Sequence, residues 1–428
     1  MSRFRTCPYP TYSIANEPVS NLPIDPAAPV PAGARLVPGG VQPNMKTPTL
    51  ISWSMRVQQA LSPNTLLTVG YVGSHGYHQL IGEDANEPIP TICPAATCPT
   101  VYPTYDASMP ITATNGPTLG FPINVPGKPD SPLAGAPVPA GSSFIPAGTP
   151  KANPSSVLTN TWTWFSAGTS NYNALQIDVN RRFSQGFSVR GVYTFSKALD
   201  DGDSLNQTTA NNSPGLVSNP FDLRADYGPA TFDVRHIGVI NAIYDLPFGS
   251  GKRYMTDASG FTNKIIGGWA VTSIVTIQSG FPFTPQLSYN PSNNGDTRNP
   301  VRPFLNPNFS GPVVLGKPAQ WFNPAAFIAP PSVIGFYGNV GRDAYTGPGL
   351  ATWDFSVLKN TSISERFNLQ FRAEIFNLLN RANFNTPNLI VFTPPSAANT
   401  TGVSGTAGAI NSTSTSSRQV QFALKLLF

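Results

Sequence analysis

The chain ends with Gln419-Val420-Gln421-Phe422-Ala423-Leu424-Lys425-Leu426-Leu427-Phe428, and this segment gives the clearest structural signal in the sequence. Large apolar side chains occupy every second position from Val420 to Phe428, and the positions between are mostly polar or small. Because a β-strand turns alternate side chains to opposite faces, the segment predicts a strand with one apolar and one mixed, mostly polar face. Chain ends usually fray, so such an apolar end indicates a strand that completes a larger sheet.

The composition favours β-structure with polar, loop-rich connections. Charged residues make up 11% of the 428 residues, against roughly 25% in ordinary soluble domains. Apolar residues account for only 40%, and the chain is instead rich in proline (46) and glycine (37). No run of about 18 apolar residues occurs, so we expect no transmembrane helix. The basic residues are dispersed along the chain, so we expect no nucleic-acid partner.

Proline maps the expected strands, because it cannot donate a hydrogen bond to a sheet ladder and avoids strand interiors. The proline-poor windows contain nine alternating or β-branched segments: Thr49–Leu61, Thr65–Val72, Leu175–Phe183, Phe187–Ser196, Asp233–Leu246, Trp269–Gln278, Thr352–Lys359, Phe367–Leu378 and the C-terminal segment. Helix is the competing interpretation for Phe367–Leu378. Strict alternation from Phe367 to Ile375 contradicts a 3.6-residue period, so we predict a strand there.

The connections between these strands alternate in length. Short turns follow Leu61, Phe183 and Lys359, whereas residues 84–172, 199–230, 284–350 and 380–417 form long loops. Short turns at one end of the strands and long loops at the other are typical of outer-membrane barrels. We therefore predict an all-β fold, an antiparallel transmembrane β-barrel of which about nine to ten strands are visible, with long extracellular loops. Residues 1–48 are expected to be a proline-rich remnant of an upstream barrel, and residues 49–428 its C-terminal part.

The two faces of the expected strands differ in charge. The polar faces carry charged residues in mid-strand, namely Arg56, Asp178, Arg190, Arg372, Glu374 and Lys425. A watery lumen accepts such charges, and we expect Arg372 and Glu374 to form a ladder with Lys425 and Asp354 on adjacent strands. The apolar faces carry aromatic residues near the strand ends, as in the girdles of membrane barrels. A soluble β-sandwich is the alternative, because its outer face accepts charge and its core accepts aromatics.

The number of strands raises a question of completeness. Bacterial single-chain barrels have even strand numbers, so nine strands ending in the periplasm at Phe428 would begin on the extracellular side near Thr49. The basic N-terminal segment lacks the apolar core of a signal peptide. We therefore expect the chain to be the C-terminal portion of a larger protein, with an unrecognised strand before Pro48 as the other explanation.

A series of short motifs, in order along the chain, resembles the Oar-like β-barrel of TonB-dependent receptors. These motifs include Asn173-Ala174-Leu175-Gln176, Arg181-Arg182-Phe183-Ser184, Tyr193-Thr194-Phe195-Ser196-Lys197-Ala198-Leu199-Asp200, Phe232-Asp233-Val234-Arg235-His236, Gly338-Asn339-Val340-Gly341-Arg342 and Leu369-Gln370-Phe371-Arg372-Ala373-Glu374-Ile375-Phe376-Asn377. The resemblance extends from about Trp53 to Phe428. It implies an outer-membrane location, a barrel of about 22 strands and energised uptake of a bulky solute through TonB.

The resemblance also implies partners. Leu424, Leu426 and Phe428 would form the signal read by the barrel-assembly machinery, and outer-membrane lipid would surround the strands. TonB would act only through an N-terminal plug, and neither a plug nor a TonB box is recognisable in this sequence. We therefore expect no transport by this chain alone. A secreted or surface-exposed β-rich adhesin or binding module is the alternative function.

No motif indicates an enzyme, a cofactor or a metal. Cys93 and Cys98 lie in a proline-rich loop and are candidates for a local disulfide, or else are two inert thiols, because no second pair completes a zinc site. No role for Cys7 follows from the sequence. His75 and His78 are expected to be structural, and the acidic segments 200–203 and 293–296 lack EF-hand spacing. A hydrolase is a distant third possibility, since no nucleophile is spaced for a triad.

Overall fold

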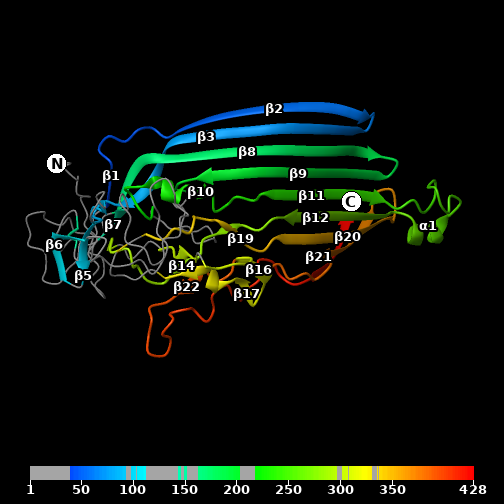
Figure 1. The fold of residues 1–428 in the computed structure, drawn as a ribbon. Coiled ribbons are helices and arrows are strands. Elements are labelled where there is room, and N and C mark those ends of the chain that lie inside the picture. Colours follow the sequence, from blue (N-terminus) through cyan, green and yellow to red (C-terminus); the bar gives the residue numbers. More distant parts are fainter. Residues whose placement is uncertain are drawn as a thin grey trace, which may run out of the picture.

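The computed structural model describes residues 39–92, 98–102, 104–111, 143–145, 149–151, 162–202, 217–295, 301–306, 308–329, 335 and 337–428. Its main element is one sheet of 11 strands, shown in Figure 1. The main path through this sheet is β2-β3-β8-β9-β11-β12-β20-β21-β23, and all its pairs are antiparallel. Among the described residues, no helix is long and apolar enough to cross a bilayer.

The path consists of nine long strands. They are β2 (Thr49–Ser62), β3 (Thr65–Asp84), β8 (Trp162–Ser184), β9 (Phe187–Asp200), β11 (His236–Asp245), β12 (Trp269–Gln278), β20 (Leu350–Ser362), β21 (Asn368–Phe376) and β23 (Gln419–Leu427). Each overlaps one segment predicted from the sequence, so the all-β antiparallel prediction is confirmed. Two short strands join the same sheet: β1 (Gly39–Val41) pairs parallel with β8, and β10 (Gly228–Pro229) pairs antiparallel with β9.

Several predicted boundaries were wrong. β3 and β8 continue their pairing as far as Asp84 and Trp162, well inside the predicted loop 84–172, with irregular register between Gly76 and Leu80. The extension is more buried than the rest of β3, and Ile81 and Asp84 are each 1% exposed. The connection 247–267 contains a short helix, α1 (Gly260–Ile266).

The tight turn between β8 and β9 follows from its two central residues. Gln185 and Gly186 both have positive φ, 53° and 80°. Two-residue hairpin turns of type I′ require positive φ at both central positions, and glycine adopts this conformation without strain. The turn brings Ser184 opposite Phe187 and connects β8 directly to its antiparallel neighbour β9.

The register collects the apolar positions of all nine strands on one face of the sheet. Leu424 lies opposite Phe371, and Val57 lies opposite Val69. This apolar face is bare, with Leu424 69% and Ile51 52% exposed. No second layer of described residues packs on it, so the sandwich alternative is wrong. An apolar surface this large needs a nonaqueous environment.

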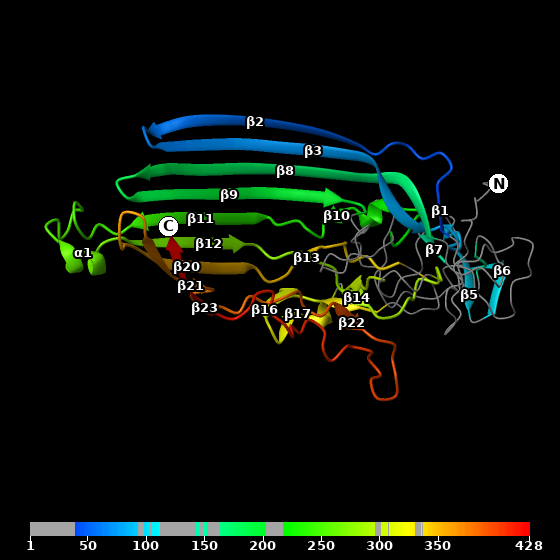
Figure 2. The same cartoon turned by 180° about the vertical axis from the view of Figure 1, so that it is seen from behind.

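The sheet has two open edges. Along the main path β2 and β23 are the terminal strands, and within the described residues neither pairs on its outer side. Figure 2 shows them at opposite margins of the sheet. Unpaired backbone N–H and C=O groups have no hydrogen-bond partner in hydrocarbon, so closure of a barrel requires further pairing at these edges.

A compact module, which we call the loop module, lies toward the sheet end opposite α1 (Figure 1). It comprises the described residues of 217–235, 279–349 and 380–417. Its short strand pairs are β13 (Pro282–Phe283) with β19 (Tyr345–Thr346), β14 (Gln286–Leu287) with β22 (Ile390–Phe392), β15 (Phe304–Leu305) with β18 (Phe327–Ile328) and β16 (Val314–Lys317) with β17 (Gln320–Phe322). Two 3-10 helices, η2 (Leu223–Asp226) and η3 (Pro324–Ala326), complete it.

The loop module has a hydrophobic core of its own. Its buried aromatic and aliphatic side chains include Phe283, Phe322, Phe327, Val340, Leu389 and Val391. Nearby, β4 (Thr91–Ile92) pairs with β7 (Ser143–Phe144), and β5 (Cys98–Tyr102) pairs with β6 (Thr104–Ile111). The described residues of the segments 284–350 and 380–417, which were predicted to be long loops, therefore fold into packed structure.

The two faces predict different responses to charge. Ile240 lies on the apolar face in mid-strand, and its neighbour Val239 lies on the polar face. We expect Ile240→Arg to reduce the free energy of unfolding in lipid vesicles by about 2–4 kcal/mol, because the arginine would face hydrocarbon near the midplane. The matched variant Val239→Arg should change it by less than about 1 kcal/mol. Urea unfolding followed by tryptophan fluorescence measures both, and equal losses would contradict the assignment of the faces.

Candidate functional site

The loop module covers the polar face of the sheet at one end, which we call the loop end. On that face Ala174 and Asp200 are 2% and 5% exposed. Their neighbours on the apolar face of the same strands, Leu175 and Phe195, are 40% and 42% exposed. The module therefore lies on the polar side of the strand ends and leaves the apolar side uncovered.

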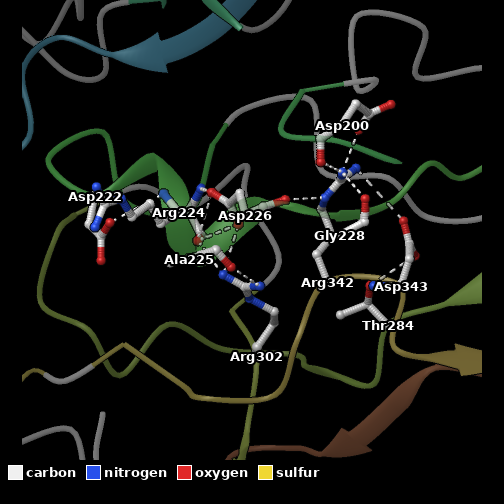
Figure 3. A network of polar contacts seen from close by, with 11 residues as sticks. Asp200, Asp222, Arg224, Ala225, Asp226, Gly228, Thr284, Arg302, Arg342 and Asp343 are labelled. Carbon is white, nitrogen blue, oxygen red and sulfur yellow. Dashed lines mark hydrogen bonds and ion pairs between the residues drawn. The ribbon is translucent and has the colours of Figure 1, made fainter. Parts of the chain in front are cut away.

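Arg342 connects the loop module to the end of β9 by an ion pair and hydrogen bonds, as Figure 3 shows. The buried guanidinium forms an ion pair with the Asp200 carboxylate and also donates a hydrogen bond to the Asp200 carbonyl. Its Nε donates to the carbonyl oxygen of Asp226 at 2.6 Å, and Nη2 donates to that of Gly228 at 3.4 Å. Arginine stays charged even when buried, so its burial requires this set of acceptors.

The close approach of Arg342 depends on a glycine. A Cβ added at Gly228 would lie 2.4 Å from the carbonyl oxygen of Arg342. Such a distance is well inside van der Waals contact, so any larger residue would push the 337–347 segment away from β10. The backbone of the module and the end of the sheet are thus in direct contact at this point.

A second buried arginine, Arg302, holds the 3-10 helix η2 in place. Its Nη2 lies 2.8 Å from Asp226 Oδ1, and Nη1 donates to the carbonyl oxygen of Ala225 at 2.9 Å. The backbone amide of Ser218 donates to Asp226 Oδ2 at 2.6 Å. Asp222 caps η2 by accepting from the amide of Arg224 at 3.2 Å. Asp226 therefore connects both arginines to one short helix.

Three further aspartates form hydrogen bonds with backbone amides or a hydroxyl group at the same end of the sheet. Asp233 Oδ1 accepts from the amide of Ala198 at 2.7 Å. The Asp343 amide donates to Thr284 Oγ1 at 2.7 Å, and that hydroxyl donates back to Asp343 Oδ1 at 3.0 Å. Asp201 Oδ1 accepts from the Thr169 amide at 2.7 Å. Burial raises the pKa of Asp201, and the hydrogen bonds from Thr169 act in the opposite direction.

The register places all six charged residues predicted for a lumen on the polar face. Arg190 Nη2 pairs with Asp178 Oδ2 at 2.7 Å across β8 and β9. Arg372 Nη1 lies 3.9 Å from Glu374 Oε1 on the same strand. Arg190 with Asp178 and Arg372 with Glu374 thus form two separate pairs. Within the described residues, neither Arg56 nor Lys425 joins them in one cluster.

The extended ladder expected around Arg372 was wrong. Asp354 accepts a hydrogen bond from the amide of Asn377 at 2.9 Å instead of pairing with Arg372. Arg372 Nε donates to Gln370 Oε1 at 3.0 Å, and Lys425 lies opposite Gln370. In the described part of the chain Lys425 makes no ion pair. Each side chain on the polar face has several possible partners within hydrogen-bonding distance. Knowing which face a residue lies on is therefore not enough to predict its partner.

The remaining predicted residues have mixed outcomes. Leu424 and Leu426 lie on the apolar face of β23, and Phe428 follows that strand and is 96% exposed. Cys7 and Cys93 lie outside the described residues, so the disulfide with Cys98 stays a prediction. Within the described ranges, no group of three or more His, Cys, Asp or Glu side chains is arranged to hold a metal ion.

Sequence reasoning missed Arg302 and Arg342 as contact residues. Arg342 ends the motif Gly338–Arg342, which marked the resemblance but gave no role to its arginine. Its partners Asp200 and Asp226 are far away along the chain and become neighbours only in the fold. Buried ion pairs between residues so far apart along the chain produce no periodic pattern in a single sequence, so the sequence alone does not predict them.

The chain belongs to the family described as the outer membrane beta barrel domain, whose model matches residues 3–421. It is therefore an outer-membrane protein with a barrel-type fold. No curated protein matches it.

Two solved structures are similar at 10% sequence identity. The outer membrane transporter YddB from Escherichia coli gives a TM-score of 0.41, with 91% of this chain and 34% of that chain covered. A Pseudomonas aeruginosa FadL homologue gives a TM-score of 0.19, with 80% and 51% covered. The chain thus spans about a third of the length of the first and about half of the second.

The buried network predicts a selective effect on the loop module. We expect Arg342→Gln to destabilise the module by about 3–5 kcal/mol, because the variant leaves the Asp200 carboxylate buried without its cation. The control Arg372→Gln breaks a more exposed contact and should cost less than about 1 kcal/mol. Hydrogen exchange in the segment 335–347 measures the loss. Unchanged protection in Arg342→Gln would contradict the role of this pair.

A pH dependence follows from Glu83. This residue lies opposite Thr163 in the extension of β3 and β8, past the last β8–β9 pair, Ser170 with Asp200, and so outside the expected membrane span. Burial, and then the charge of Asp84, raises the pKa of Glu83 from its ordinary value of 4.5 to about 7. The stabilisation from protonated Glu83 is therefore complete below pH 4.5 and is lost as the pH rises through about 7.

Glu83→Gln should remove this dependence. We expect the variant to unfold at a higher temperature than the native chain at pH 8 and at nearly the same temperature at pH 4. Glu365→Gln, which removes an exposed carboxylate from the turn between β20 and β21, is the control and should behave as the native chain. Thermal unfolding followed by circular dichroism measures the difference. A benefit of Glu83→Gln that is equal at both pH values would show that charge is not its cause.

Proposed function

We propose that this chain forms part of the barrel of a TonB-dependent receptor, which takes up a bulky solute across the outer membrane. The observation that carries the proposal is the loop module folded over the polar face at one end of the sheet. A receptor needs a structured surface above a polar passage, and this arrangement supplies both. The proposal involves no catalysis and no cofactor.

The polar face would line the passage. Arg56, Asp178, Arg190, Arg372, Glu374 and Lys425 all lie on it by register. Charges of both signs, separated along the strands, suit a hydrated lumen that passes a polar solute. The loop module would make the first contact with that solute, because it occupies the end of the passage with the long connections.

Transport would need more than the described sheet. The open edges of β2 and β23 would pair with further strands, and energised uptake in such receptors works through a plug. We therefore infer that this chain alone does not transport. We also infer that Leu424, Leu426 and Phe428, exposed at one edge of the sheet, are read by the barrel-assembly machinery, and that lipid covers the apolar face.

A surface binding module is the second candidate, and one observation favours it. The loop module has its own hydrophobic core, centred on Phe283, Phe322 and Phe327. A module of this kind could bind a partner at the cell surface without any passage of solute. Surface attachment independent of cellular energy would favour this candidate over uptake.

The test compares two proteins in detergent for binding to the purified periplasmic domain of TonB. The first is this chain alone, and the second is this chain joined to its native upstream coding sequence. We expect no binding by the first and micromolar binding by the second, measured by biolayer interferometry. Binding by the chain alone would contradict the role of a plug, and no binding by either protein would contradict TonB dependence.

A further inference from the structure

A polar and cationic patch interrupts the apolar face at the loop end. We call it the outward patch, and it consists of Tyr71, His75, Asn173, Tyr193, Lys197 and His236. The register places these residues side by side on four adjacent strands. Asn173 of β8 lies opposite Lys197 of β9, and His236 of β11 lies opposite Phe195 of β9. All six share the face of Val69 and Ile177, which are apolar rungs nearer the middle of the sheet.

Hydrogen bonds hold the side chains of the outward patch in fixed orientations. Tyr71 donates to Asn173 Oδ1 at 2.6 Å, and Tyr193 Oη shares a hydrogen bond of 2.8 Å with His236 Nδ1. His75 Nδ1 lies 2.8 Å from Asn171 Oδ1, and Asn171 in turn donates to Tyr227 Oη at 2.9 Å. Both histidines use Nδ1 in these bonds, and neither Nε2 forms a hydrogen bond with another described residue. Polar groups arranged in this way are prepared for a ligand at low entropic cost.

The charge of the outward patch is unbalanced. Lys197 is exposed and, within the described residues, forms no ion pair. The neighbouring outward positions on β2, β3, β8 and β9 carry no aspartate or glutamate. At the opposite end of the same face, by contrast, Lys359 donates to the carbonyl oxygen of Gly267 and lies 5.4 Å from the ring of Trp269. Lys359 at one end of the apolar face thus contacts groups of the chain itself, whereas Lys197 at the other end forms no ion pair with a described residue.

We propose that the outward patch binds the phosphate of a membrane-lipid headgroup in the leaflet on the loop side. The patch lies at the loop end of the apolar face, beyond Val69 and Ile177, which is the depth of the headgroups if Val69 and Ile177 face hydrocarbon. Lysine is a strong point-charge partner for phosphate, and tyrosine and histidine bring donors on amphipathic rings suited to this depth. A protein partner is less suited to the site, because lipid surrounds the same face directly below it.

The test uses the full chain in a nonionic detergent, titrated with dihexanoyl phosphatidic acid. We expect the lipid to raise the unfolding temperature in a saturable way. Dihexanoylglycerol, which lacks the phosphate, and inorganic phosphate, which lacks the acyl chains, should give no comparable shift. Lys197→Gln should weaken the apparent affinity roughly fivefold, as expected for loss of one cation near a membrane surface. His236→Gln should weaken it in the same direction.

Lys264→Gln is the matched control, since Lys264 is an exposed lysine of α1 at the opposite end of the sheet. It should bind the lipid as the native chain does. Equal affinity of the native chain and Lys197→Gln would overturn the proposal, as would equal weakening by Lys264→Gln. An equal shift with inorganic phosphate would indicate an adventitious ion only and would also overturn it. A change of oligomeric state in Lys197→Gln, measured by light scattering, would assign the patch to protein contact instead.

Discussion

The structure depends on the pairing of backbone hydrogen-bonding groups in a medium that offers no substitute for them. Hydrocarbon cannot hydrogen-bond to N–H or C=O, so every strand in the membrane needs a neighbour on both sides. The meander from β2 to β23 meets this requirement for its seven inner strands. Within the described residues, the outer edges of β2 and β23 keep unpaired N–H and C=O groups. Pairing at these two edges therefore determines whether the molecule encloses a passage. The polar side chains on one face can line an enclosed passage only if the sheet closes at these edges.

At the loop end of the sheet, buried ion pairs and apolar packing organise the structure. Two buried arginines, Arg302 and Arg342, join segments that are distant in sequence, and Asp226 is in contact with both. Buried ion pairs contribute little net stability compared with apolar packing, but they are costly to break and they favour one arrangement over others. The apolar core around Phe322 supplies the cohesion of the module, and the arginines fix its position on the sheet.

The apolar face changes character along its length in a way that matches a membrane. Its middle rungs are aliphatic, and its loop end carries Tyr71, Tyr193, Lys197 and His236. Aromatic and basic side chains at such a boundary are general features of membrane proteins. The specific feature in this chain is that these groups hydrogen-bond to one another while Lys197 forms no ion pair with any described residue.

The sequence by itself determined the nine strands, their antiparallel order and the face to which each charged residue belongs. Period-two alternation follows from the local geometry of the extended backbone. It therefore assigns Val57, Arg190 and Leu424 to one face or the other without knowledge of the tertiary structure. Only the tertiary structure decided the extension of β3 and β8, the packed core in the proline-rich segments, and the pairing of Arg342 with Asp200. These features arise from contacts between residues far apart in the chain. A single sequence carries no periodic signal for them, because the side chains involved are selected by partners that folding brings together.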